Sequence, residues 1–149
     1  KSNLINNLYK LQNYGEVLIE KFIPGREIQV AIFGSQKLGA IELKPKRKFY
    51  DYEAKYNPNA KTKHIIPVKI SKKNYNKVTD LALKAHNILQ CRGVTRSDFR
   101  FYKDRFYLLE TNTQPGMTSL SLVPEIAKYN NISFIQLIEK IIKDASINK

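Results

Sequence analysis

Hydrophobic residues recur along the chain with two periods, and each period predicts a different kind of element. Spacings of three and four residues predict helices that follow the candidate caps Ser2, Ser71 and Ser133. Gln136 stands three residues after Ser133, which is the spacing of a capping box. A further helix is expected to begin near Ser121.

Runs of strand-like composition alternate with turn residues elsewhere in the chain. Strands are predicted over residues 17–22, 27–33, 37–43, 94–102 and 106–112. Helices and strands mix without a regular β–α–β alternation, which favours an α+β fold with a mainly antiparallel sheet flanked by helices. We expect residues 1–149 to form a single domain of this kind. The polar and aromatic stretch between Lys44 and Lys63 has no period, so it is expected to be either a functional loop or disordered.

Composition narrows the class of protein without fixing it. The 149 residues contain no apolar run near the ~20 residues that span a bilayer, and the start of the chain lacks a signal-peptide core. The only cysteine, Cys91, is compatible with a reducing cytoplasm. The chain does not begin with Met, and it is therefore expected to be a piece of something longer.

The net charge of +13 requires an explanation. Between Lys37 and Lys73 there are eleven Lys or Arg residues against three acids, so much of the excess lies there. Such a patch suits nucleic acid, an anionic membrane or a ligand that carries phosphate, and the plain alternative is a solvated surface.

Four polar residues on one predicted hairpin carry the strongest chemical signal: Arg96 and Asp98 on one strand, Glu110 and Asn112 on the other. Residues two apart on a strand share a face. With a three-residue loop at 103–105, the register places Asp98 opposite Glu110 and Arg96 opposite Asn112, on one face. The other face would then hold Phe99, Phe101, Tyr107 and Leu109.

Two opposed carboxylates repel unless something neutralises them. A hard cation such as Mg²⁺ suits a site whose protein ligands are all oxygen atoms. The alternative is a salt-bridged surface in which Arg96 and Arg100 balance the acids. A slip of one residue in the hairpin would bring Asp98 beside Leu109 and remove the site.

Four segments of the chain resemble, in the same order, the D-alanine–D-alanine ligases, a family of ATP-grasp enzymes. They are residues 17–27 (VLIEKFIPGRE), 49–56 (FYDYEAKY), 96–98 with 109–118 (RSD and LETNTQPGMT), and 119–124 (SLSLVP). In this family ATP activates one D-alanine as an acyl phosphate. The amine of a second D-alanine then attacks it, which gives the dipeptide used in peptidoglycan.

The resemblance implies a role for each matching residue of the hairpin. Glu110 would bridge two Mg²⁺ ions, with Mn²⁺ as an alternative metal, and Asp98 and Asn112 would complete one site each. Arg96 and the backbone N–H of Gly116 would stabilise the oxyanion of the tetrahedral intermediate.

Other matching residues would contact the substrates. Ser121 and Leu122 would hold the carboxylate of the second D-alanine. Glu27 would bind the ribose hydroxyls of ATP. On a loop that closes as a lid, Lys55 would reach the phosphates and Tyr56 would close the D-alanine pocket. The residues implied to contact adenine are Glu20, Lys21, Phe22, Ile23 and Leu109.

The resemblance also implies that the chain is the C-terminal part of the enzyme. The N-terminal substrate domain and the small ATP-grasp lobe would be absent or incomplete, so the chain alone is expected to be inactive. The whole protein would be a cytoplasmic homodimer that binds ATP and D-alanine, with neither nucleic acid nor membrane as partner. The alternatives are a D-alanine–D-lactate or D-alanine–D-serine ligase, another ATP-grasp carboxylate–amine ligase, and a basic nucleic-acid-binding module.

Overall fold

A five-stranded antiparallel sheet with the order β3-β2-β1-β4-β5 forms the centre of the fold. The structure is a computed structural model that describes residues 2–44, 62–118 and 121–146. The strands are β1 (Arg26–Phe33), β2 (Gln36–Lys44), β3 (Lys63–Ile65), β4 (Val94–Tyr102) and β5 (Arg105–Asn112). The helices are α1 (Ser2–Leu11), α3 (Lys72–Ile88), α4 (Leu122–Tyr129) and α5 (Phe134–Asp144), with a 3₁₀ turn η1 at Gln12–Tyr14. The predicted α+β architecture is therefore confirmed.

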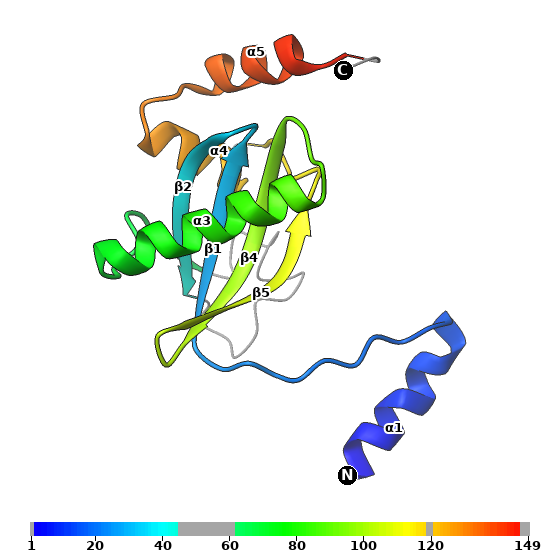
Figure 1. The fold of residues 1–149 in the computed structure, drawn as a ribbon. Coiled ribbons are helices and arrows are strands. Elements are labelled where there is room, and N and C mark those ends of the chain that lie inside the picture. Colours follow the sequence, from blue (N-terminus) through cyan, green and yellow to red (C-terminus); the bar gives the residue numbers. More distant parts are fainter. Residues whose placement is uncertain (1, 45–61, 119–120, 147–149) are drawn as a thin grey trace.

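Helices cover the two faces of the sheet unequally, as Figure 1 shows for α3, which runs across one face. Under α3 the core is built from the buried residues Ile28, Val30, Val78, Ala82 and Phe99. The core under α4 and α5 is built from Ala31, Ile41, Leu43, Ile126 and Leu137. Alternate residues of β1 enter opposite cores, as period-two geometry requires. This division fixes which face of β4 and β5 is left for polar residues.

Two helix starts follow the predicted caps, whereas α1 begins at the predicted cap Ser2 itself. The Oγ of Ser71 accepts a hydrogen bond from the backbone N–H of Asn74 at 3.2 Å. Ser133 and Gln136 form the complete capping box at the start of α5. Each cap satisfies N–H groups that have no partner within the helix. Within the described part of the chain, every helix is too short or too polar to cross a bilayer.

The prediction of a strand over residues 17–22 is wrong. Residues 16–24 have no regular structure, and Leu18 is 82% exposed. In Figure 1 this segment leads away from the sheet to α1, and no strand lies beside it. A strand-like sequence forms a strand only when a neighbour accepts its backbone hydrogen bonds. Residues 17–22 have the composition of a strand, but no strand of the described chain lies beside them to accept these hydrogen bonds.

The β4–β5 hairpin differs from prediction at its loop yet agrees with it at the polar end. The turn has two residues, Lys103 and Asp104, both with positive φ (47° and 55°), so Tyr102 pairs with Arg105. A bulge between the pairs at Phe99 and Asp98 then adds one residue to β5. The partners of Phe99 and Phe101 are consequently Leu108 and Phe106, and the predicted apolar face with Tyr107 and Leu109 is wrong.

His86 is a buried titratable group between α3 and β4. Its Nδ1 lies 2.8 Å from the Oγ1 of Thr95, and the residue is almost fully covered. Burial lowers the pKa of His86, and a hydrogen bond with the backbone of Cys91 opposes that shift. The native state therefore favours the neutral ring, whereas the unfolded chain takes up a proton near pH 6.5.

The turn at Lys103 and Asp104 predicts a stabilising substitution. Both residues adopt the left-handed conformation that Asn and Gly tolerate best. We expect Lys103→Asn combined with Asp104→Gly to raise the free energy of unfolding by about 1 kcal/mol, because strain of this size is relieved. Urea unfolding measures the change. Asp104→Ala is the control and should not stabilise, and an unchanged or lower value for the Asn-Gly turn would contradict the reading.

A second prediction concerns pH. The contribution of His86 is fully present above about pH 6.5 and is lost as the pH falls towards the lower pKa of the folded state. The parent protein should lose free energy of unfolding between pH 7.5 and 5. We expect His86→Gln to lose less over this range, with a difference of at most about 1.4 kcal/mol for each pH unit. Urea titrations of both proteins across this range provide the measurement. Parallel curves for the two proteins would show that His86 is not the titrating group.

Candidate functional site

Polar side chains line the sheet face opposite α3, across β1, β4 and β5. Directly opposed residues share a face, and three rows cross these strands. The rows are Ala31–Arg96–Asn112, Gln29–Asp98–Glu110 and Glu27–Arg100–Tyr107. We call the polar members, Glu27, Gln29, Arg96, Asp98, Arg100, Glu110 and Asn112, the polar face. The predicted pairing of Asp98 with Glu110 and of Arg96 with Asn112 is confirmed.

Arg96 binds Asp98 with both prongs of its guanidinium. Its Nε and Nη2 donate to Oδ1 and Oδ2 of Asp98 at 2.8 and 3.0 Å. The Nη2 also lies 3.8 Å from Oε1 of Glu110. Asp98 is only 5% exposed, whereas the Glu110 side chain is 59% exposed. The arginine therefore balances a buried carboxylate and leaves the second carboxylate directed towards solvent.

The oxygen ligands proposed for a metal fit a magnesium site. Asp98, Glu110 and Asn112 offer oxygen atoms from one face of the hairpin. No group of three His, Cys, Asp or Glu side chains with metal-site geometry occurs in the described ranges. Few protein carboxylates, completed by water and substrate phosphates, are the usual set for Mg²⁺. The Oδ1 of Asn112 also accepts from the backbone N–H of Gln114 at 2.9 Å, which fixes the start of the next loop.

That loop brings Gly116 against the start of α4. A Cβ at Gly116 would lie 2.9 Å from the Oγ of Ser121, so a side chain there would displace Ser121. The Oγ of Ser121 accepts from the backbone N–H of Thr118 at 2.9 Å and makes no capping bond to α4. Gly116 and the Ser121 side chain at the start of α4 therefore lie in close contact. Backbone N–H groups at a helix start suit an anionic group.

Glu27 stands at the other end of the polar face, beside a hollow of about 500 Å³. Its Oε2 lies 3.4 Å from Nη2 of Arg100, whose Nη1 donates to the carbonyl of Gly25 at 3.2 Å. Lys44 and Lys69 also line the hollow. The sequence reasoning did not find this pairing of Glu27 with Arg100. The two-residue spacing of Arg96, Asp98 and Arg100 is the signal that could have indicated it.

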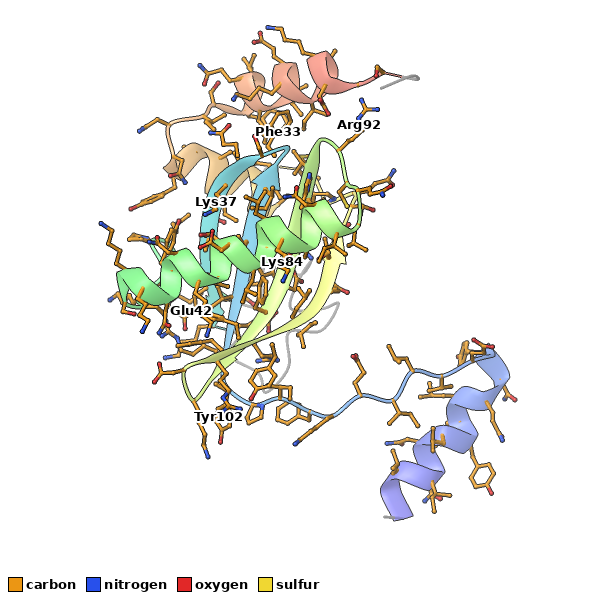
Figure 2. The ribbon with its side chains drawn as sticks, viewed as in Figure 1. Phe33, Lys37, Glu42, Lys84, Arg92 and Tyr102 are labelled. Carbon is orange, nitrogen blue, oxygen red and sulfur yellow. The ribbon has the colours of Figure 1, made fainter. Side chains whose placement is uncertain are left out.

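The hollow also contains an ion pair that the sequence did not predict. Arg26 donates from Nε and Nη2 to the two carboxylate oxygens of Glu42 at 2.8 and 2.6 Å. The hydrogen bond and the negative charge of Glu42 raise the pKa of Arg26, although its partial burial opposes this. Figure 2 shows Glu42 on β2, within the sheet. Both residues line the hollow, although they point to the α3 side of the sheet and Glu27 to the other.

Part of the basic charge lies away from the polar face. Lys37 pairs with Asp80 of α3, and Figure 2 shows Lys37 and Lys84 on the α3 side of the molecule. An exposed pair of this kind contributes little to stability. For these lysines the plain interpretation, a solvated surface, is sufficient.

The remaining predicted site residues are less tightly placed. Glu20, Lys21, Phe22 and Ile23 lie on the irregular segment before β1, where Phe22 is 59% exposed. Leu109 is the added residue of the β5 bulge and is half exposed. The structure does not gather these five residues into one pocket. Lys55 and Tyr56 lie outside the described residues.

Comparison with known proteins points to one family. The family model described as "D-ala D-ala ligase C-terminus" matches residues 2–143. The D-alanine–D-alanine ligase of Pelagibacter ubique is 67% identical over 149 residues, which is all of this chain and 49% of that protein. The D-alanine–D-alanine ligase of Xanthobacter autotrophicus is 47% identical over 142 residues, or 91% of this chain and 46% of that protein. The chain thus spans about half the length of the curated relatives it matches.

Solved structures give the same result. The D-alanine–D-alanine ligase of Bacillus anthracis superposes with a TM-score of 0.83 at 32% identity, over 97% of this chain and 47% of that one. The same enzyme in complex with ATP superposes with a TM-score of 0.81 at 28% identity, over 97% and 46%.

The bidentate ion pair of Arg96 with Asp98 predicts that substitutions at these two residues have strongly non-additive effects on the free energy of unfolding. We expect Arg96→Met to lower the free energy of unfolding by about 3 kcal/mol, because a buried carboxylate loses its partner. Adding Asp98→Asn should restore at least about 1 kcal/mol of this loss, since the uncompensated charge disappears.

Urea unfolding of both single variants and the double variant measures this coupling. Arg105→Met, at the exposed first residue of β5, is the matched control and should change stability little. Additive effects of the two substitutions would show that the ion pair does not stabilise the fold.

Proposed function

Because the chain belongs to the D-alanine–D-alanine ligase family, we propose that it is the C-terminal part of an enzyme that uses ATP to join two D-alanines through an acyl phosphate. The observation that supports this most strongly is the polar face. It sets Asp98 opposite Glu110 and Asn112 opposite Arg96. The hairpin thus combines acidic oxygen ligands with a guanidinium, which are the groups that the transfer of a phosphoryl group requires.

In this proposal Asp98, Glu110 and Asn112 would hold Mg²⁺, with Mn²⁺ as the alternative metal. Glu110, whose side chain is 59% exposed, would be the ligand shared between two ions, and Asp98 and Asn112 would each complete one site. Bound metal would supply positive charge that offsets the negative charge on the γ-phosphoryl group and on the leaving ADP.

Arg96 and the N–H of Gly116 have a different task, which is to stabilise negative charge on the tetrahedral intermediate. Arg96 already lies in the polar face, fixed by Asp98. Ser121 and Leu122 bind the carboxylate of the second D-alanine at the start of α4, next to Gly116. The attacking amine and the oxyanion would therefore meet at one edge of the sheet.

Nucleotide contacts complete the proposed site. Glu27 binds the ribose hydroxyls at the hollow, where Arg100 fixes its carboxylate. Residues 20–23 and Leu109 contact adenine once the rest of the enzyme is present. Lys55 and Tyr56 act from the loop as a lid that excludes water from the acyl phosphate.

The known relatives support some of the finer predictions and leave others untested. The ATP complex of the Bacillus anthracis enzyme supports ATP as the nucleotide. The relatives compared above are named for D-alanine, which favours it over D-lactate or D-serine. A cytoplasmic homodimer without nucleic-acid or membrane partners stays a prediction from the resemblance. So does the need for an N-terminal half that binds the first D-alanine.

The bridging carboxylate provides the test. In the complete ligase we expect Glu110→Gln to lower the rate of D-alanyl-D-alanine formation at least about 100-fold, because the variant keeps the size but loses the charge between the cations. Phosphate release with D-alanine, together with identification of the dipeptide, measures the activity. Glu139→Gln, an exposed acid on α5, is the matched control and should keep full activity. An active Glu110→Gln enzyme would overturn the proposed metal site.

A further inference from the structure

Gln29 occupies the centre of the polar face but has no place in the roles given above. It is 0% exposed on the middle strand β1, directly opposite Asp98 and two residues from Glu27. Its Nε2 donates to Oε1 of Glu27 at 3.4 Å. Its Oε1 has no hydrogen-bond partner within the part of the chain that the structure describes.

An unpartnered buried carbonyl oxygen is costly, so an apolar side chain would fit this core position better. On β2, the residue paired with Gln29 is the apolar Ile41. The nearest polar groups on the same face, Glu27 and Asp98, are carboxylates and cannot donate a hydrogen bond when ionised. The Nε and Nη2 donors of Arg96 are directed at Asp98. None of these described groups supplies the missing donor, so we look for it in a ligand.

We propose that Gln29 is a positioning residue of the nucleotide site, whose Nε2 holds Glu27 and whose Oε1 accepts a hydrogen bond from an O–H group that arrives with the magnesium–nucleotide complex. This inference rests on the proposed function. Two O–H groups satisfy the chemistry: a ribose hydroxyl held at Glu27, and a water bound to the cation at Asp98. Ionised phosphates offer no donor. Because Gln29 is covered in the ligand-free chain, a shift of the neighbouring side chains accompanies binding.

The test compares the complete ligase with its Gln29→Met variant. Methionine is unbranched and of similar length, but it makes no strong hydrogen bond. Thermal unfolding without ligand and calorimetric titration with Mg·ADP are measured on both proteins. We expect the variant to melt no lower than the parent, and its Kd for Mg·ADP to rise about tenfold. Gln36→Met, at the distant β1–β2 turn, is the control and should leave the Kd unchanged.

Two further titrations identify the donor. If the variant binds ADP without Mg²⁺ as well as the parent does, the donor is water of the cation. If it binds Mg²⁺ with 2′,3′-dideoxy-ADP as well as the parent does, the donor is the ribose. Either result supports the assignment.

Other outcomes overturn it. A loss that persists in both titrations, or a lower melting temperature with unchanged Kd, would show that Gln29 only packs the core. Equal affinity of parent and variant for Mg·ADP would refute the role of Gln29 but leave the proposed function intact. Absence of Mg·ADP binding by the parent enzyme would instead refute the proposed function, and the assignment with it.

Discussion

The position of Glu110 depends on one added residue in β5. The turn at Lys103 and Asp104 pairs Tyr102 with Arg105, and a regular ladder from that pair would place Leu109 opposite Asp98. Glu110 would then point to the α3 side, because neighbouring residues on a strand face opposite ways. The bulge restores the register before the polar face begins. Arg96, Asp98, Glu110 and Asn112, the four hairpin residues of the polar face with proposed catalytic or metal roles, all lie beyond that point.

Within the polar face, the negative charges of the buried acids are already balanced by arginines. Asp98 and Glu27 are buried acids on the same sheet face, and each has an arginine beside it, Arg96 and Arg100 respectively. These pairs hold the carboxylates in fixed positions at the end of a well-packed sheet. In the proposed site Asp98 and Glu27 would therefore need little change in their own position, whereas the exposed Glu110 would adjust to the ligand.

Sequence reasoning succeeded where the signal is local and failed where it depends on a partner. Ser71 and Ser133 cap their helices because the capping bond spans only three residues. The strand at 17–22 has the right composition, but its neighbour is not in the described chain. The hairpin register was reached through two opposite errors, since the loop is one residue shorter than expected and the bulge compensates. The pairs of Glu27 with Arg100 and of Arg26 with Glu42 join separate strands and left no motif.

The β5 bulge has a second consequence, which concerns contact with other molecules. Among the described residues β5 is the last strand of the sheet, so no described strand pairs with its outer row of backbone groups. Edge strands of this kind can pair with a strand from another chain and so seed aggregation. The bulge bends the edge within the half-exposed, apolar pair Leu108 and Leu109, where such pairing would otherwise be most favourable. The same irregularity that aligns the carboxylates thus makes this open edge a poor template for self-association.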